Sequence, residues 1–185
     1  VVDVGGHIGF YAIQQSMRMA ATGKVLVYEP NPQSFERLLK NVRANDLTNV
    51  QAFNNAVTSR RSDVRLRIAS VSSEACTIME QGTTSSYNRE VTVQATTLDD
   101  ILDANGLASI DLLKIDAEGA EVDIAEGGRG RALSVTKKAI VETHSDSLRD
   151  EVKRRFGECG FTVMGEVPSG RNALGQNTML YFVRR

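Results

Sequence analysis

The feature that most constrains this chain is a short apolar segment at its start that enters a glycine-rich turn. Val1–Val4 has the composition of a buried strand, the turn carries Gly5, Gly6 and Gly9, and the next dozen residues are typical of a helix. Such a turn suits a nucleotide-like ligand, because glycines allow close approach and free amides at a helix start attract negative charge. Since natural chains rarely begin inside a core strand, we expect native sequence before residue 1.

Short apolar strands alternate with helical stretches along most of the chain. Asn31 and Pro32 are a typical N-cap and first residue of the helix that follows the second strand. The alternation predicts an α/β fold with a mostly parallel sheet and helices on both faces. The strands expected are Val1–Val4, Val25–Tyr28, Val50–Phe53, Asp111–Ile115, Ala139–Val141, Phe161–Met164 and Met179–Val183. The last two are separated by a predicted loop at Pro168–Asn177 and can pair antiparallel.

The stretch at about 58–97 breaks this rhythm. Val64, Leu66 and Ile68 alternate with polar residues, as do the residues around Val93, which indicates half-exposed antiparallel strands. Gly82–Ser86 between them has the composition of a mobile loop. We interpret this stretch as a β-ribbon inserted into a single domain that spans residues 1–185.

Composition excludes several classes of partner. The 22 basic and 23 acidic residues leave a net charge of −1 without a basic cluster, so neither nucleic acid nor an anionic membrane is an expected partner. No apolar run approaches the ~20 residues that span a bilayer. Cys76 and Cys159 lie far apart, as expected of reduced thiols in a cytoplasmic protein. The oligomeric state cannot be read from the sequence.

The candidate cofactor residues lie at the glycine turn and after the second strand. A dinucleotide fingerprint, G-x-G-x-x-G, would need a glycine where Val4 stands, so the turn favours a cofactor without a pyrophosphate. Glu29 follows Gly9 by 20 residues and can accept hydrogen bonds from both hydroxyls of a ribose. His7, within the turn, is expected to shape it or to contact the cofactor.

The candidate catalytic residues follow the fourth and fifth strands. Asp116, Glu118 and Glu121 come just beyond the fourth strand, where ligands bind in open α/β sheets. Asp116 is the preferred candidate, and one of the two glutamates is expected only to favour a helix start. Glu142 and His144 end the fifth strand, and a histidine can accept a hydroxyl proton near neutral pH.

In this order the motifs resemble the FkbM family of S-adenosylmethionine-dependent methyltransferases. The resemblance runs along nearly the whole chain, with Gly6-His7 as a departure where family members often carry Ala-Asn. It rests on Asp3–Gly9, Glu29–Pro32, Asn41, Asn45, Asn55–Val57, Thr97–Asp100, Leu113–Glu121 and Glu142–His144. It implies a Rossmann-like class I fold of seven strands, the last antiparallel. It also implies cofactor contacts by Asp3, Gly5, Gly6, His7, Gly9, Glu29, Asn55 and Asp116.

The resemblance implies transfer of a methyl group to a hydroxyl of a sugar or small natural product. His144, Asp116 and Glu142 are then the expected catalytic residues, because an alcohol is a poor nucleophile until it loses its proton. No complete metal-ligand set is readable, so no metal is expected, although a metal-assisted O-methyltransferase stays open. An NAD-dependent oxidoreductase, a nucleic-acid amino-methyltransferase and an inactive cofactor-binding module also stay open.

Overall fold

The computed structural model describes residues 1–20, 22–69, 76–78, 87–172 and 175–184. Its contacts divide the chain into two compact units, the first made of residues 1–56 and 62–95, the second of residues 57–61 and 96–185. The chain therefore passes between the units at three places, after residues 56, 61 and 95. The loop predicted at Gly82–Ser86 lies outside the described residues.

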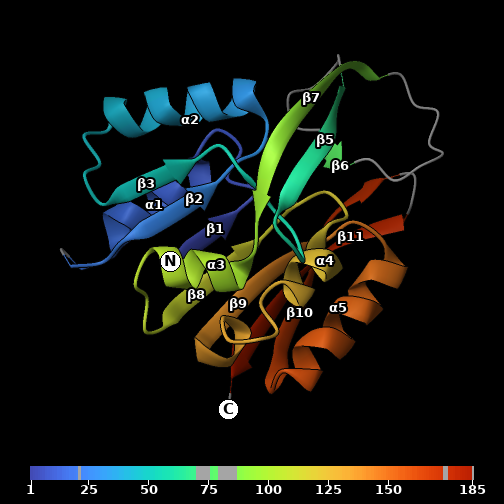
Figure 1. The fold of residues 1–185 in the computed structure, drawn as a ribbon. Helices are drawn as coiled ribbons and strands as arrows, with labels where there is room; N and C mark the ends of the chain where they lie inside the picture. The colour runs from blue at the N-terminus through green and yellow to red at the C-terminus, as the bar shows by residue number, and fades with distance from the viewer. Residues whose placement is uncertain (21, 70–75, 79–86, 173–174, 185) are drawn as a thin grey trace. The chain divides into compact units, whose positions relative to one another are not determined.

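The first unit begins with three parallel strands and two helices. The elements are β1 (Val2–Val4), α1 (Phe10–Arg18), β2 (Val25–Tyr28), α2 (Pro32–Ala44) and β3 (Val50–Phe53). Figure 1 shows α2, in blue, running along the three strands. The side chains buried between them are Ala12, Val25, Val27, Leu38 and Val42. The Asn31 side chain accepts a hydrogen bond from Gln33 N at 3.0 Å, so the predicted N-cap of α2 is confirmed.

A ribbon of antiparallel strands follows, and most of its residues belong to the first unit. The elements of its sheet are β4 (Ala56–Val57), β5 (Ser62–Ala69), β6 (Cys76–Ile78) and β7 (Tyr87–Thr96), in the order β4-β7-β5-β6. Val64 lies opposite Val93, and Leu66 opposite Val91. The antiparallel strands predicted from alternation are confirmed, and their buried residues include Leu66 and Val93.

The second unit carries the remaining strands and three helices. Its elements are α3 (Leu98–Ala104), β8 (Ile110–Ile115), α4 (Glu121–Glu126), the 3₁₀ turn η1 (Leu133–Val135), β9 (Thr136–Thr143), α5 (Asp146–Glu158), β10 (Phe161–Asn172) and β11 (Gly175–Arg184). β8 and β9 are parallel, whereas β11 runs antiparallel to both β9 and β10. The loop predicted at Pro168–Asn177 is wrong, because the β10–β11 hairpin continues through most of it. The polar residues of this segment indicate exposure to solvent, and not the end of strand pairing between β10 and β11.

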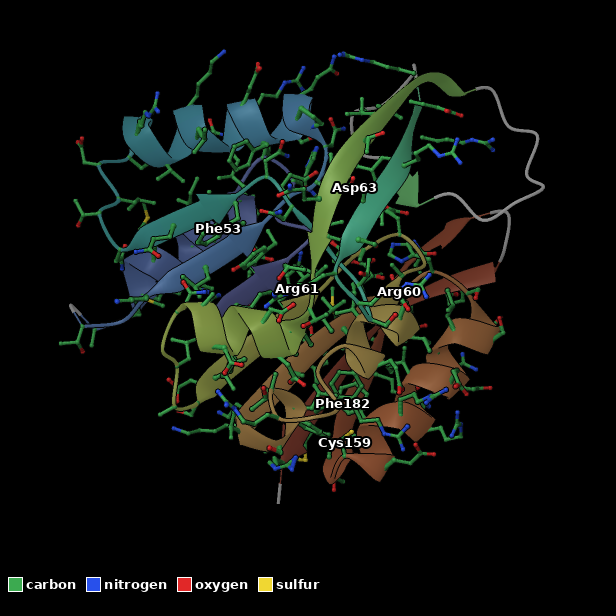
Figure 2. The ribbon with its side chains drawn as sticks, viewed as in Figure 1. Phe53, Arg60, Arg61, Asp63, Cys159 and Phe182 are labelled. Atoms are coloured by element: carbon green, nitrogen blue, oxygen red, sulfur yellow. The ribbon has the colours of Figure 1, made fainter. Side chains whose placement is uncertain are left out.

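Three aromatic rings form part of the interior of the second unit. Phe156 on α5 stacks on Phe182 of β11 with ring centroids 4.6 Å apart, and Phe161 meets both rings edge-on. Phe182 and Cys159 are labelled in Figure 2. Burial raises the pKa of the Cys159 thiol. These contacts fix the C-terminal part of α5 to the β10–β11 hairpin.

Seven strands hydrogen-bond in the order β10-β11-β9-β8-β1-β2-β3. The predicted fold class, a mostly parallel seven-stranded sheet with its last strand antiparallel, is thus confirmed. Among the described residues, no helix is long and apolar enough to cross a membrane.

Candidate functional site

The glycine turn follows β1, and its backbone conformation requires glycine. Gly5 and Gly9 have φ values of 77° and 89°, in the left-handed region that favours glycine. The amides of Gly5 and Gly6 both donate to the Tyr28 carbonyl, at 2.9 and 3.2 Å, and Gly9 N donates to Gly6 O at 2.8 Å. These amides stabilise the turn itself, whereas the sequence led us to expect them at the cofactor.

Close packing explains the glycine that departs from the family pattern. A Cβ at position 6 would stand only 2.1 Å from Cγ1 of Val27, so alanine does not fit unless Val27 moves. On the other side of the turn, Asn41 Nδ2 donates to Ile8 O at 2.8 Å. The turn is therefore held from both β2 and α2, which gives it one defined shape.

Glu29 lies just after β2 and is nearly buried, with 6% of its surface exposed. Its two carboxylate oxygens accept from His7 N at 2.7 Å and Asn31 N at 2.8 Å. Asn54 Nδ2 donates to the Glu29 carbonyl at 2.8 Å, which holds the backbone in place. Sequence reasoning missed Asn54, because an asparagine after a strand is common at turns. Glu29 thus links the glycine turn to the start of α2 and presents a fixed negative charge there.

Three other predicted cofactor residues have distinct environments. Asp3 is fully buried on β1, opposite Val27. His7 adopts a φ of 47°, and its Nε2 is buried without a hydrogen-bond partner among the described residues. Asn55 Nδ2 donates to Gln94 O of the ribbon at 3.3 Å. The buried Nε2 of His7 is a polar atom that a bound molecule could satisfy.

The second unit gathers the other predicted site residues at the ends of β8 and β9. Asp116 follows β8, and His144 follows β9. His144 Nε2 lies 3.6 Å from Asp116 Oδ1 and 3.6 Å from Glu118 Oε2. Because β8 and β9 are parallel neighbours, their carboxyl ends meet at one edge, as the sequence predicts for Asp116 and His144.

Glu121, the first residue of α4, holds His144 from the other side. Its side chain is completely buried, and Oε1 lies 3.0 Å from His144 Nδ1 and 3.0 Å from Gly119 N. The other oxygen, Oε2, is buried without a hydrogen-bond partner among the described residues. The sequence led us to interpret one of Glu118 and Glu121 as a helix-start acid, but both contact His144.

The carboxylates change the charge of His144. Its burial disfavours the charged form, but the hydrogen bond to Glu121 and the charges of the surrounding carboxylates outweigh that cost and raise the pKa of His144 to about 9. At neutral pH the imidazole therefore carries a second proton, unlike the ordinary histidine assumed from the sequence. Burial, with help from neighbouring carboxylates, also raises the pKa of Glu118.

Two further side chains border this group. Lys114 Nζ lies 3.4 Å from Asp116 Oδ2, which leaves Oδ1 as the oxygen nearest His144. Glu142 Oε1 accepts a hydrogen bond from Ser169 Oγ at 2.6 Å. The second unit therefore holds three acids, Asp116, Glu118 and Glu121, around one buried histidine.

Comparison with known proteins decides the family. The family model described as "Methyltransferase FkbM domain" matches residues 3–163 of the chain. The chain belongs to the FkbM methyltransferase family. Two curated relatives agree. Methyltransferase sdnD of Sordaria araneosa is 25% identical over an alignment that covers 88% of this chain and 73% of the relative. Hexuronic acid methyltransferase AglP of Haloferax volcanii is 28% identical over 157 residues, 84% of this chain and 60% of AglP.

Solved structures agree on the fold. Methyltransferase FkbM from Methylobacillus flagellatus superposes with a TM-score of 0.69 at 16% identity, over 97% of this chain and 42% of its own. Fibrillarin from Aeropyrum pernix, with natively bound S-adenosylmethionine, superposes with a TM-score of 0.59 at 13% identity, over 98% of this chain and 65% of its own. The chain spans less than half of the Methylobacillus protein. As a member of the FkbM methyltransferase family, it uses S-adenosylmethionine.

The first unit fits S-adenosylmethionine. The carboxylate of Glu29, fixed by two amides, can still accept hydrogen bonds from ribose hydroxyls, because each oxygen has a second lone pair. The buried Nε2 of His7 can meet a polar group of the cofactor.

Proposed function

We propose that this protein transfers a methyl group from S-adenosylmethionine to a hydroxyl oxygen of a sugar or another small molecule. The observation that carries the proposal is the buried His144, flanked by Asp116 and Glu118 at the end of β8. A methyl group on a sulfonium is already activated, whereas an alcohol must lose its proton to attack well. A group of carboxylates at the ligand-binding edge of the sheet supports this chemistry.

In this proposal His144, Asp116 and Glu142 are the catalytic residues. The hydroxyl proton passes to a carboxylate, Asp116 or Glu142, while the oxygen attacks the methyl carbon in line with its bond to sulfur. Oxygen–carbon bond formation and carbon–sulfur bond cleavage release S-adenosylhomocysteine. The proposed cofactor residues are Asp3, Gly5, Gly6, His7, Gly9, Glu29, Asn55 and Asp116.

The name of AglP supports a sugar acid as the acceptor class to test first, because that relative is a hexuronic acid methyltransferase. A hexuronic acid offers both hydroxyls and a carboxylate. A carboxylate needs no deprotonation at neutral pH, so it would make little use of the acids around His144. We therefore favour a hydroxyl as the acceptor.

The experiment is a transfer assay with methyl-labelled S-adenosylmethionine and a panel of hexuronic acids, matching neutral hexoses and amino sugars. We expect a methyl ether that survives mild alkali. A product from which alkali releases methanol would be an ester and would contradict a hydroxyl acceptor. Label on the nitrogen of an amino sugar, without any ether product, would contradict O-methylation altogether.

A further inference from the structure

Three ligand atoms of the kind that bind metal ions meet at the end of β8. Asp116, Glu118 and His144 each offer one, and the three atoms lie within 4.8 Å of one another. The His144 Nε2 is 3.6 Å from each carboxylate oxygen, beyond ordinary hydrogen-bond length. Ligands around a tetrahedral cation with bonds of about 2.0–2.1 Å stand roughly 3.4 Å apart, so small side-chain movements would suffice.

We propose that Asp116, Glu118 and His144 bind a divalent metal ion, with two carboxylate oxygens and the Nε2 nitrogen as its protein ligands. The set comes from two neighbouring strand ends that the fold holds in register. This proposal departs from the expectation from sequence that the chain has no metal site, and takes up the metal-assisted alternative. Glu118 is the ligand that the sequence left unassigned, because a glutamate before a helix has an ordinary explanation.

The position of Glu121 is a second, independent indication. A histidine that binds a metal through one nitrogen usually donates its other N–H to a carboxylate, which fixes the ring and its tautomer. Glu121 Oε1 stands 3.0 Å from Nδ1 and is fully buried, so Nε2 is directed to the other two acids. The Oε2 of Glu121 is buried without a hydrogen-bond partner among the described residues, so this oxygen is left unsatisfied.

The charges around His144 also favour a cation of charge two. Asp116, Glu118 and Glu121 carry three negative charges, and Lys114 beside Asp116 supplies one positive charge. Two negative charges remain once Nε2 of His144 has given up its proton to bind the ion. A fully buried carboxylate such as that of Glu121 is costly unless a proton or a metal ion compensates it. A divalent ion would reduce that cost and bind directly to Nε2.

The ligand types narrow the choice of ion. Imidazole with carboxylates suits Zn²⁺ or Mn²⁺, whereas Mg²⁺ prefers oxygen ligands and keeps its water. Three protein ligands leave at least one coordination position open. A hydroxyl bound there would become more acidic, as a metal-bound water does. Glu142 would then be the carboxylate left to accept the proton.

Direct binding to the cofactor-free protein tests the site, so its failure is separate from that of the methyl-transfer proposal. After treatment with a chelator, the protein is titrated with ZnCl₂ and with MnCl₂ by calorimetry, and bound Mn²⁺ is measured by paramagnetic resonance. We expect one site per chain. His144→Ala and Glu118→Gln should each weaken binding by at least 10-fold, and Glu121→Gln by about 10- to 100-fold.

The matched control is Asp150→Asn, which removes an exposed carboxylate of α5 that pairs with Arg149. Its affinity should equal that of the wild type. Glu118 is 42% exposed, so Glu118→Gln should leave the fold intact, as circular dichroism would verify. No binding of either ion by the wild-type protein would overturn the proposal. Equal affinity in the wild type and in folded Glu118→Gln and His144→Ala would overturn it as well.

Discussion

Substitution of Glu29 tests whether this residue binds the cofactor or only stabilises the glycine turn. Glu29 accepts from two backbone amides, at 2.7 and 2.8 Å, and is nearly buried. Alanine would leave both amides without a partner, and each buried orphan costs about 1–3 kcal/mol, so the fold itself would suffer. Glu29→Gln is the sharper change, because its oxygen can still accept from one amide while its NH₂ group faces the other.

We expect Glu29→Gln to affect two quantities. The free energy of unfolding should fall by roughly 1–3 kcal/mol through the one amide left unsatisfied. The affinity for S-adenosylhomocysteine should fall by a further 1.5–3 kcal/mol, about 10- to 150-fold in Kd, since charge-assisted bonds to ribose are lost. Calorimetry gives the affinity and urea titration the stability. The control, Glu36→Gln, changes an exposed residue of α2.

The two quantities together test the reasoning. If Glu29→Gln loses stability but binds S-adenosylhomocysteine as tightly as the wild type, Glu29 only clamps the turn. If the free energy of unfolding is unchanged, the hydrogen bonds to the Glu29 carboxylate do not contribute the predicted value of about 1–3 kcal/mol to stability. Binding is measured without denaturant, where the folded fraction of the variant can be checked by circular dichroism.

Three further predictions concern other parts of the chain. His144→Ala should lower kcat by roughly 10²–10⁴-fold on a true acceptor with little change in the affinity for S-adenosylhomocysteine, and a normal kcat would make His144 structural. Gly6→Ala should lower the free energy of unfolding by about 1–3 kcal/mol in a urea titration, because the new Cβ would clash with Val27. Adding Val27→Ala should recover part of that loss. Simple additivity of the two single effects would contradict the clash. Burial raises the pKa of the Cys159 thiol, so its alkylation needs a higher pH in the folded protein. In a Cys76→Ser variant, the midpoint of the pH profile of the alkylation rate should lie higher for the folded than for the urea-unfolded protein. Coincident profiles would refute this.

Much of the fold could be predicted because its signals are local. Apolar runs and helix caps depend on a few neighbouring residues, and the strands Val25–Tyr28 and Val50–Phe53 match the structure at both ends. The fifth predicted strand is too short because Thr136–Lys138 is polar, and yet these residues pair with β8. Polar residues at the start of a strand give no periodic signal, so only the partner strand reveals them.

The candidate site could be predicted only in part. Asp116 and His144 are recognisable because they directly follow apolar strands. The roles of Glu118 and Glu121 depend on a turn in which Glu118 takes a φ of 48° and Gly119 a φ of 105°. Such a left-handed pair cannot be read from residue types, and both glutamates that contact His144 lie in or close to it. The raised pKa of His144 depends on the carboxylates beside that turn, so it could not be predicted from the sequence either.

The threefold passage of the chain between its two units has a practical consequence for anyone who wishes to divide the protein. A fragment that ends at residue 56 lacks the ribbon of the first unit, and a fragment that begins at residue 96 lacks residues 57–61 of the second. Those five residues include Thr58, whose carbonyl would stand 2.2 Å from a Cβ at Gly127, and Arg61, which pairs with Asp100. No single cut yields either half whole, so split reporters and domain swaps would need a rejoined, rearranged chain.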